Sequence, residues 1–305
     1  MKYAKKCFVA CLLLYSSATL CPQEIAFPLI QALAWIPPAE NNLLPAQSRV
    51  WSVSLSDANL FSFSRDQAVI NDMSIFSLYF SYRRGLSAGL TLEVFAGARI
   101  YYDSGADQLI KKVDDALGFP DSGRDVFPER TIHYKFKDHF YYNRDRWVPA
   151  PLVLGLTGRV LRIGNLALNG RLNIGIPLSD QPGFSSKKIF ALAGLMFEYA
   201  HDSLVVSGAA EMAFFNSPAW LVNEQLGHSY FEASLKIRFS KFLLGAIFRT
   251  SPFEYAENGN NGKVIYIGYL IKKRFEIGFM EDIPPMDTVP DFAFYLKIHL
   301  NRLQH

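Results

Sequence analysis

The sequence predicts an all-β fold: a closed up-and-down antiparallel transmembrane β-barrel of about 12 strands, with one long helix-containing extracellular loop. Three observations lead to this prediction. Apolar residues alternate with polar or small ones in repeated segments from Arg49 onward, which is the pattern of strands with two different faces. The links between these segments are alternately short and long, and the chain begins with an export signal.

The N-terminus has the pattern of a signal peptide. Three lysines precede an apolar run from Cys7 to Tyr15, and the small residues 16–18 follow it. The apolar run is shorter than the roughly 18 to 20 residues that a spanning helix needs, so we expect cleavage rather than anchoring. The predicted segments are a signal peptide (1–20), an N-terminal periplasmic segment or plug-like lead-in (21–47) and the barrel (48–305, with a long loop at 103–150).

Composition limits the remaining classes of protein. Half of the residues are apolar and 19% are charged, which excludes a disordered chain, and the lack of long apolar runs excludes a helical membrane protein. Cleavage removes three lysines and no acid, so the formal net charge falls from +3 to zero. The chain therefore carries no charge signal for nucleic acid, and it has no phosphate-binding glycine loop or nucleic-acid motif.

Cysteine chemistry is confined to the N-terminus. Cys7 and Cys11 lie in the signal, which leaves Cys21 as the single cysteine of the mature chain. A disulfide framework or a thiolate metal site is therefore excluded. Cys21 is either lipidated or simply left beside the cleavage site. Leu20, where lipoprotein signals usually have a small residue, favours the second reading.

Period-two alternation recurs along the whole predicted barrel. In the third segment, for example, Leu92 and Val94 share one face while Thr91 and Glu93 share the other. The predicted strands lie at Trp51–Ser56, Phe76–Tyr82, Leu90–Ile100, 151–161, 166–177, 188–199, 204–215, 229–239, 241–250, 263–271, 274–280 and 291–300.

The links distinguish a membrane barrel from a soluble sandwich or a lipocalin-like barrel. Links after even-numbered strands are short, whereas links after odd-numbered strands are long, as at 57–73 and 103–150. A Greek-key sandwich would not keep this strict alternation. An up-and-down barrel keeps it, because its short turns face the periplasm and its long loops face outward.

Charged residues within the predicted strands fall mainly on the face opposite the apolar one. We expect them to line the lumen: Glu93, Arg99, Arg159, Arg171, Glu211, Glu232, Lys236, Arg238, Arg249, Glu276 and Lys297. Several apolar residues share that face, namely Phe190, Leu192, Met196, Val264, Tyr266 and Leu270. Such a lumen is too apolar for a wide water channel, which predicts a narrow or plugged one.

The 103–150 loop is the most distinctive segment. Asp107–Leu117 has the spacing of an amphipathic helix and precedes a run of turn formers and charges. Arg124 can pair with Asp121 or Asp125. The loop either constricts the barrel mouth or packs on itself through the same pairs.

This loop also carries a resemblance to a known family. The run Gly118–Glu129, the helix before it and the N-terminal stretches Pro28–Gln31, Ile36–Glu40, Leu43–Pro45 and Asp57–Phe61 resemble the domain of unknown function 3187 family. The resemblance covers nearly the whole mature chain and implies an exported outer-membrane barrel. That family has no assigned activity, so the resemblance implies no functional residues. The chain departs from barrels generally in running on to His305 instead of ending in an aromatic residue.

Three histidines, His133, His139 and His228, are candidates for a catalytic role. His228 and Ser229 are adjacent and would point to opposite faces of a strand, which makes them a poor nucleophile and base pair. His133 and His139 lie near Asp138, a set that could serve a surface hydrolase or bind a cation. No spacing typical of metal ligands occurs, so we predict no catalytic residue, metal or cofactor.

The sequence thus favours a non-enzymatic outer-membrane barrel of a diderm bacterium, a narrow channel or transporter for small solutes of amphipathic or apolar character. Its expected partners are outer-membrane lipid, the barrel assembly machinery and an unidentified small solute, without nucleic acid. Two alternatives remain open. The barrel either displays the 103–150 loop to a partner surface, or it is an outer-membrane hydrolase.

Overall fold

A computed structural model supplies the fold. It describes residues 43–63, 69–103, 112, 131–221, 227–250, 252, 262–272, 274–282 and 292–300. The signal peptide, most of the 21–47 segment, nearly all of the helix predicted over 107–117 and the loop residues Asp121, Arg124 and Asp125 lie outside the described residues. Within the described ranges, no helix is long and apolar enough to cross a membrane.

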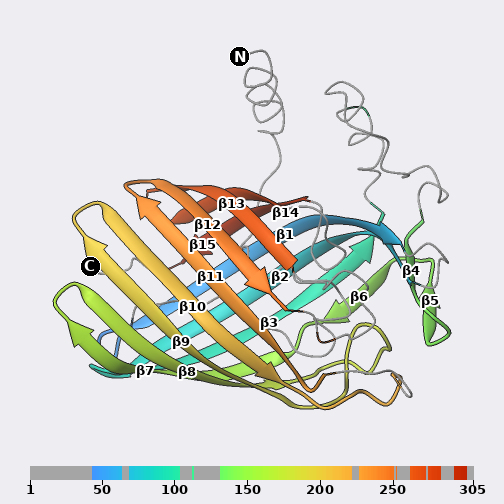
Figure 1. The fold of residues 1–305 in the computed structure, drawn as a ribbon, viewed down its shortest axis with the longest axis horizontal. Coiled ribbons are helices and arrows are strands. Elements are labelled where there is room, and N and C mark those ends of the chain that lie inside the picture. Colours follow the sequence, from blue (N-terminus) through green and yellow to red (C-terminus); the bar gives the residue numbers. More distant parts are fainter. Residues whose placement is uncertain are drawn as a thin grey trace.

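Twelve antiparallel strands form the barrel wall (Figure 1). Each pairs with its neighbour in sequence, and the last strand pairs with the first, Val53 lying opposite Ile298. The prediction of a closed up-and-down barrel is therefore confirmed. The strands are β1 (Arg49–Phe63), β2 (Val69–Ser87), β3 (Leu90–Tyr102), β7 (Leu152–Ile163), β8 (Leu166–Ile176), β9 (Phe190–His201), β10 (Leu204–Phe214), β11 (Ser229–Phe239), β12 (Phe242–Arg249), β13 (Gly262–Ile271), β14 (Phe275–Asp282) and β15 (Phe292–His299).

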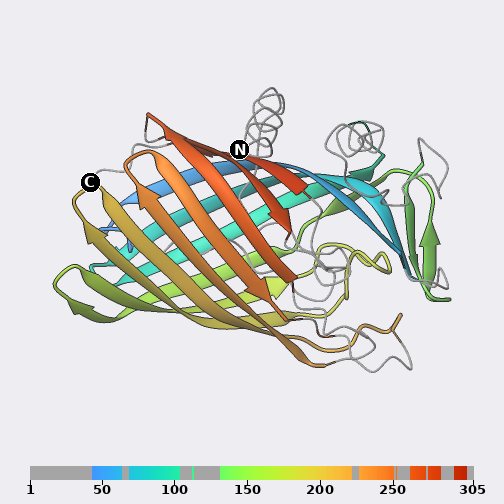
Figure 2. The same ribbon diagram turned by 45° about the horizontal axis from the view of Figure 1, so that its top comes forward.

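Three short strands extend the wall at the end that carries the long loops (Figure 2). They are β4 (His133–Phe136), β5 (Phe140–Tyr142) and β6 (Arg146–Pro149), all inside the segment predicted as one long loop. β4 pairs with β2, β5 pairs with β4, and β6 pairs with β3. The described part of the 103–150 loop is thus largely an extension of the sheet.

The prediction of a long link at 57–73 was wrong, because β1 and β2 run through most of it. In this part of the wall, polar residues occupy the outer face, which removes the apolar alternation. Tyr102 donates a hydrogen bond to Asp57 Oδ1 at 2.9 Å, and Asn59 Nδ2 lies 3.5 Å from Ser74 Oγ. These polar contacts end the apolar band on the long-loop side.

Elsewhere, the outer face of the wall is apolar, as contact with lipid requires, and the inner face is not. Large apolar side chains on the outer face are exposed, whereas the side chains between them point inward and are mostly buried. At the opposite end, the hairpins are tight and contain residues with left-handed backbone, including Gly164 (φ 54°) and Asp202 (φ 50°). Exposed outward residues include Trp51, Phe80, Leu156, Leu172, Ile174, Leu195, Leu244 and Ile267.

Candidate functional site: the barrel lumen

The strand register places all eleven predicted lumen residues on the inner face. Six of them are almost fully buried at the centre of the barrel or near it: Glu93, Arg99, Arg171, Glu211, Glu232 and Arg249. Glu276 and Lys297 are also buried, Lys236 and Arg238 are half-buried, and Arg159 is exposed at the short-turn end.

A belt of six paired charges lies along the inner wall of the lumen. We define the charged belt as Arg83, Glu93, Arg171, Glu211, Glu232 and Arg249, none of which is more than 3% exposed. Glu93 accepts from Arg83 Nε at 3.0 Å and from Arg171 Nε at 3.1 Å. Arg171 also donates to Glu211 Oε1 at 3.1 Å, and Arg249 donates to Glu232. The first three ion pairs therefore link β2, β3, β8 and β10, and the fourth links β11 to β12.

Strand register explains why these residues meet. Arg171 lies opposite Gly194 on β9, and Gly194 lies opposite Glu211 on β10. A Cβ atom on Gly194 would lie 2.5 Å from Glu211 Cγ, so only glycine leaves room for the two long side chains to meet across β9. Glu211 in turn lies opposite Glu232, which lies opposite Arg249.

The belt is held together by charge and by aromatic rings. Buried carboxylates and guanidinium groups are costly to desolvate, and they are tolerated because each has a partner of opposite charge. The Arg171 guanidinium also lies 5.5 Å from the centre of the Phe95 ring, and buried Arg99 donates to the Tyr79 hydroxyl at 2.6 Å. Long charged residues thus fill the middle of the lumen.

A second, smaller cluster lies between the belt and the short-turn end. Lys236 Nζ lies 2.9 Å from Glu276 Oε1, and the Tyr295 hydroxyl donates to the same oxygen at 3.0 Å. Lys297 lies opposite Glu276 in the register of β14 and β15. This cluster joins β11 to β14 and β15, two strands that carry no residue of the belt.

An aromatic cap closes the long-loop side. We define it as Tyr101, Tyr134, Phe140, Tyr142, Phe184 and Trp220. Ring centres of Tyr101, Tyr134 and Tyr142 lie 4.5, 5.1 and 5.0 Å from that of Phe184, on the β8–β9 loop. Tyr134 donates to Gly183 O at 2.8 Å, and Trp220 donates to Ser185 O at 2.8 Å.

The aromatic cap continues into the lumen as an apolar layer. Buried inward side chains such as Phe190, Leu192, Val264 and Tyr266 belong to the same packed cluster as the cap. The expectation of an apolar, narrow lumen rested partly on these four residues, and the structure places all of them there.

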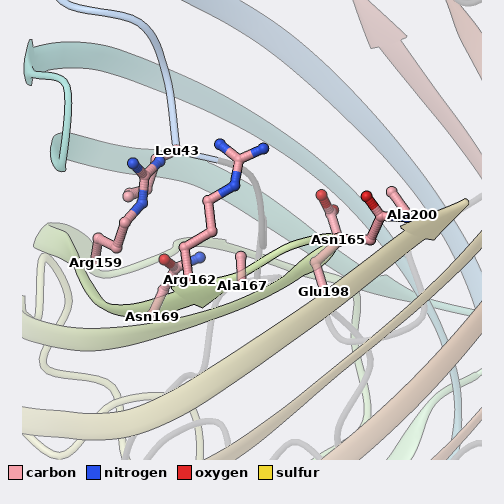
Figure 3. A pocket seen from close by; sticks show the side chains of 8 residues that line it. All are labelled: Leu43, Arg159, Arg162, Asn165, Ala167, Asn169, Glu198 and Ala200. Carbon is pink, nitrogen blue, oxygen red and sulfur yellow. The ribbon is translucent and has the colours of Figure 1, made fainter.

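The short-turn end has a different character. A cavity of about 190 Å³ opens there, and Figure 3 shows Arg159 and Arg162 projecting from β7 to the same side. Its lining residues are Leu43, Arg159, Arg162, Asn165, Ala167, Asn169, Glu198 and Ala200, which we call the mouth cavity. Both arginines are exposed, whereas Asn169 is buried.

Sequence analysis missed three charged residues that face the lumen: Glu198, which lies within the predicted strand 188–199, and Arg83 and Arg162. The two arginines were expected in turns, and each lies near a β-bulge that interrupts the alternation. In β7 the bulge falls between Arg159 and Leu161. The consecutive apolar residues at 160 and 161 are a signal that could have revealed it.

The histidines considered for catalysis have other contacts. His133 Nδ1 lies 2.8 Å from the Tyr141 hydroxyl, and its Nε2 lies 3.1 Å from Thr131 Oγ1. The His139 ring stacks on Phe136, with ring centres 5.7 Å apart. Among the residues that the structure describes, no group of three His, Cys, Asp or Glu side chains could hold a metal ion.

Comparison with known proteins supports the fold. No protein-family model matches the chain, and no curated protein matches it. An outer-membrane channel from Pseudomonas putida F1 is similar in structure, with a TM-score of 0.52 and 10% identity over 87% of this chain and 98% of that one. This chain therefore has the fold of an outer-membrane β-barrel.

Two further solved structures are more remote. The KdgM porin has a TM-score of 0.43 and 7% identity, covering 82% of this chain and 99% of its own. Outer-membrane phospholipase A from Escherichia coli has a TM-score of 0.41 and 11% identity, covering 86% of this chain and 95% of its own. The resemblance to the domain of unknown function 3187 family stays a prediction.

Proposed function

We propose that this protein is a non-enzymatic outer-membrane channel or transporter for small solutes of amphipathic or apolar character, and that the structure corresponds to its closed state. The observation that carries the proposal is the charged belt, whose six side chains point into the lumen and are at most 3% exposed. A solute can pass only when some of these ion pairs separate.

The outer wall supports a membrane location. Exposed Leu, Ile and Phe side chains cover the middle of the strands, and a closed barrel satisfies all backbone groups within the wall. The predicted signal peptide agrees with export to the outer membrane.

The composition of the lumen supports the solute class. The lumen holds an aromatic cap and an apolar layer as well as charged and amide groups. A solute with an apolar part and a polar part meets compatible surfaces along this path, whereas a wide water-filled pore would require a polar wall throughout.

Single-channel conductance of the refolded barrel in a planar bilayer tests the proposal. The variant Arg171→Ala/Glu211→Ala removes one complete link of the belt and leaves Glu93 its pair with Arg83. We expect its conductance in potassium chloride to exceed that of the wild type several-fold. The matched control, Asp180→Asn/Lys187→Met, removes an exposed ion pair of the β8–β9 loop and should conduct as the wild type does.

If the belt variant folds and conducts no more than the wild type, the channel proposal fails. The alternative of a barrel that displays its 103–150 segment to a partner would then be favoured. Folding of each variant is checked by the shift in electrophoretic mobility on heating.

A further inference from the structure

Within the part of the chain that the structure describes, the two arginines of the mouth cavity form no ion pair with a carboxylate, unlike the arginines of the charged belt. We propose that the mouth cavity binds an anionic group, a carboxylate or a phosphate, through Arg159 and Arg162. This inference rests on the proposed function, because an anion site in the lumen implies that the solute of the channel carries a negative charge. It is tested by binding, which does not require an open lumen.

A β-bulge builds the site. In a regular strand, residues 159 and 162 would point to opposite faces. The register moves from Arg159 opposite Asn169 to Leu161 opposite Leu168, so residue 160 is extra and Arg162 comes to lie opposite Ala167. Both arginines therefore face the lumen, as Figure 3 shows. Bulges often serve to redirect a side chain in this way.

The environment of the two arginines favours an anion. Across the described part of the chain, neither guanidinium group has a carboxylate within ion-pair distance, in contrast to Arg83, Arg171 and Arg249 of the belt. The planar guanidinium group presents donors in a fork that matches the oxygens of a carboxylate or phosphate. Arg159 and Arg162 on β7 together present two guanidinium groups to one anion.

The other lining residues agree with this assignment. The amide of Asn165 can add donors, and Glu198 is the single carboxylate among the eight lining residues. The cavity therefore keeps a positive charge. Its volume of about 190 Å³ exceeds the roughly 30 Å³ of a water molecule several-fold, which leaves space for an oxyanion.

The surrounding wall at the short-turn end adds to the positive potential. Lys236, Arg238 and Lys297 face the lumen there, and Glu276 pairs with Lys236 and lies opposite Lys297. A cleft lined by charges of one sign concentrates ions of the other sign. An anion that enters from this end is thus attracted before it reaches Arg159 and Arg162.

Isothermal titration of the full-length barrel in detergent micelles tests the site. Inorganic phosphate and benzoate are titrated separately at constant ionic strength, so that the two anion classes are distinguished. We expect saturable binding of at least one anion and at least tenfold weaker binding to Arg159→Gln/Arg162→Gln. The control Arg274→Gln removes one positive charge from the β13–β14 turn at the same end and should bind as the wild type does.

Absence of binding to the wild type, or equal binding to the double variant, would overturn the site. If the double variant does not fold, the single variants replace it, and each should weaken binding several-fold. If no anion binds but the belt variant conducts more than the wild type, the anion site is rejected and the channel proposal stands. If an anion binds but the belt variant conducts no more than the wild type, the channel proposal is rejected and the anion site stands.

Discussion

The charged belt and the mouth cavity use the same residue type in opposite ways. Arg171 of β8 is buried and shared between two carboxylates, whereas Arg159 of the neighbouring β7 is exposed and has no such partner in the described residues. Asn169, one inward position along β8 from Arg171, lies opposite Arg159. A short distance along one wall thus separates an arginine that closes the lumen from one that is free to bind a ligand.

This contrast teaches that burial and pairing decide what a lumen charge does. A buried ion pair makes a structural link, because separating it leaves an uncompensated charge in a poorly hydrated interior. An exposed arginine contributes little to folding and keeps its donors available. The same sequence pattern, a charge on the polar face of a strand, therefore predicts location but not role.

The largest expected effect is at Arg171. Arg171→Met leaves Glu211 buried without the guanidinium that pairs with it, and loss of one partner of a buried ion pair costs about 3 to 5 kcal/mol. Urea unfolding of the barrel refolded in phospholipid vesicles measures this change. Arg171→Met/Glu211→Gln removes both charges and should recover part of the loss. Equal stability of the single and double variants would show that the pair is not coupled.

A smaller effect is expected from crowding the belt. The Cβ atom of Gly194→Val would meet Glu211 Cγ at 2.5 Å and Ala210 O at 2.8 Å, so the side chains must shift, at about 1 to 3 kcal/mol. Gly170→Val is the matched control, because a Cβ there would touch only Val160 Cγ2 at 3.4 Å. The comparison fails if both substitutions lower the unfolding free energy equally.

The smallest effect on stability is expected at the mouth cavity. Arg159→Gln/Arg162→Gln removes two exposed charges that make no ion pair within the described chain, and such surface changes usually stay within about 0.5 kcal/mol. The same urea titration measures it. A loss approaching that of Arg171→Met would mean that these arginines hold the barrel together, and it would remove the contrast with the belt.

Much of the barrel could be predicted from the sequence because the outer face contacts lipid and the inner face contacts polar groups. Lipid outside and a polar interior impose period-two alternation on every spanning strand, and the tight hairpins impose short links. Where the outer face becomes polar, as at Asp57 and Asn59, this pattern fades, so the first predicted strand ends too early and the second begins too late. A bulge hides a charge in the same way, as at Arg162.

The pairing within the lumen could not be predicted from alternation. Glu93 and Arg171 are 78 residues apart, and Arg171 reaches Glu211 across Gly194 on an intervening strand. Such contacts depend on which strands lie close together in the wall and on how far their register is staggered. The alternation within a single strand gives no information on either the neighbouring strands or the stagger of their register.

The seam between β1 and β15 has a consequence for how the barrel forms. Ser52 and His299, whose side chains lie 3.2 Å apart across this seam, are separated by 247 residues. The other wall strands of this barrel join partners that are adjacent in the chain, so most hairpins can form locally, whereas the seam needs nearly the whole chain. Contacts of such long sequence separation form slowly. Ring closure is therefore expected to be a late kinetic step, before which the sheet has two open edges.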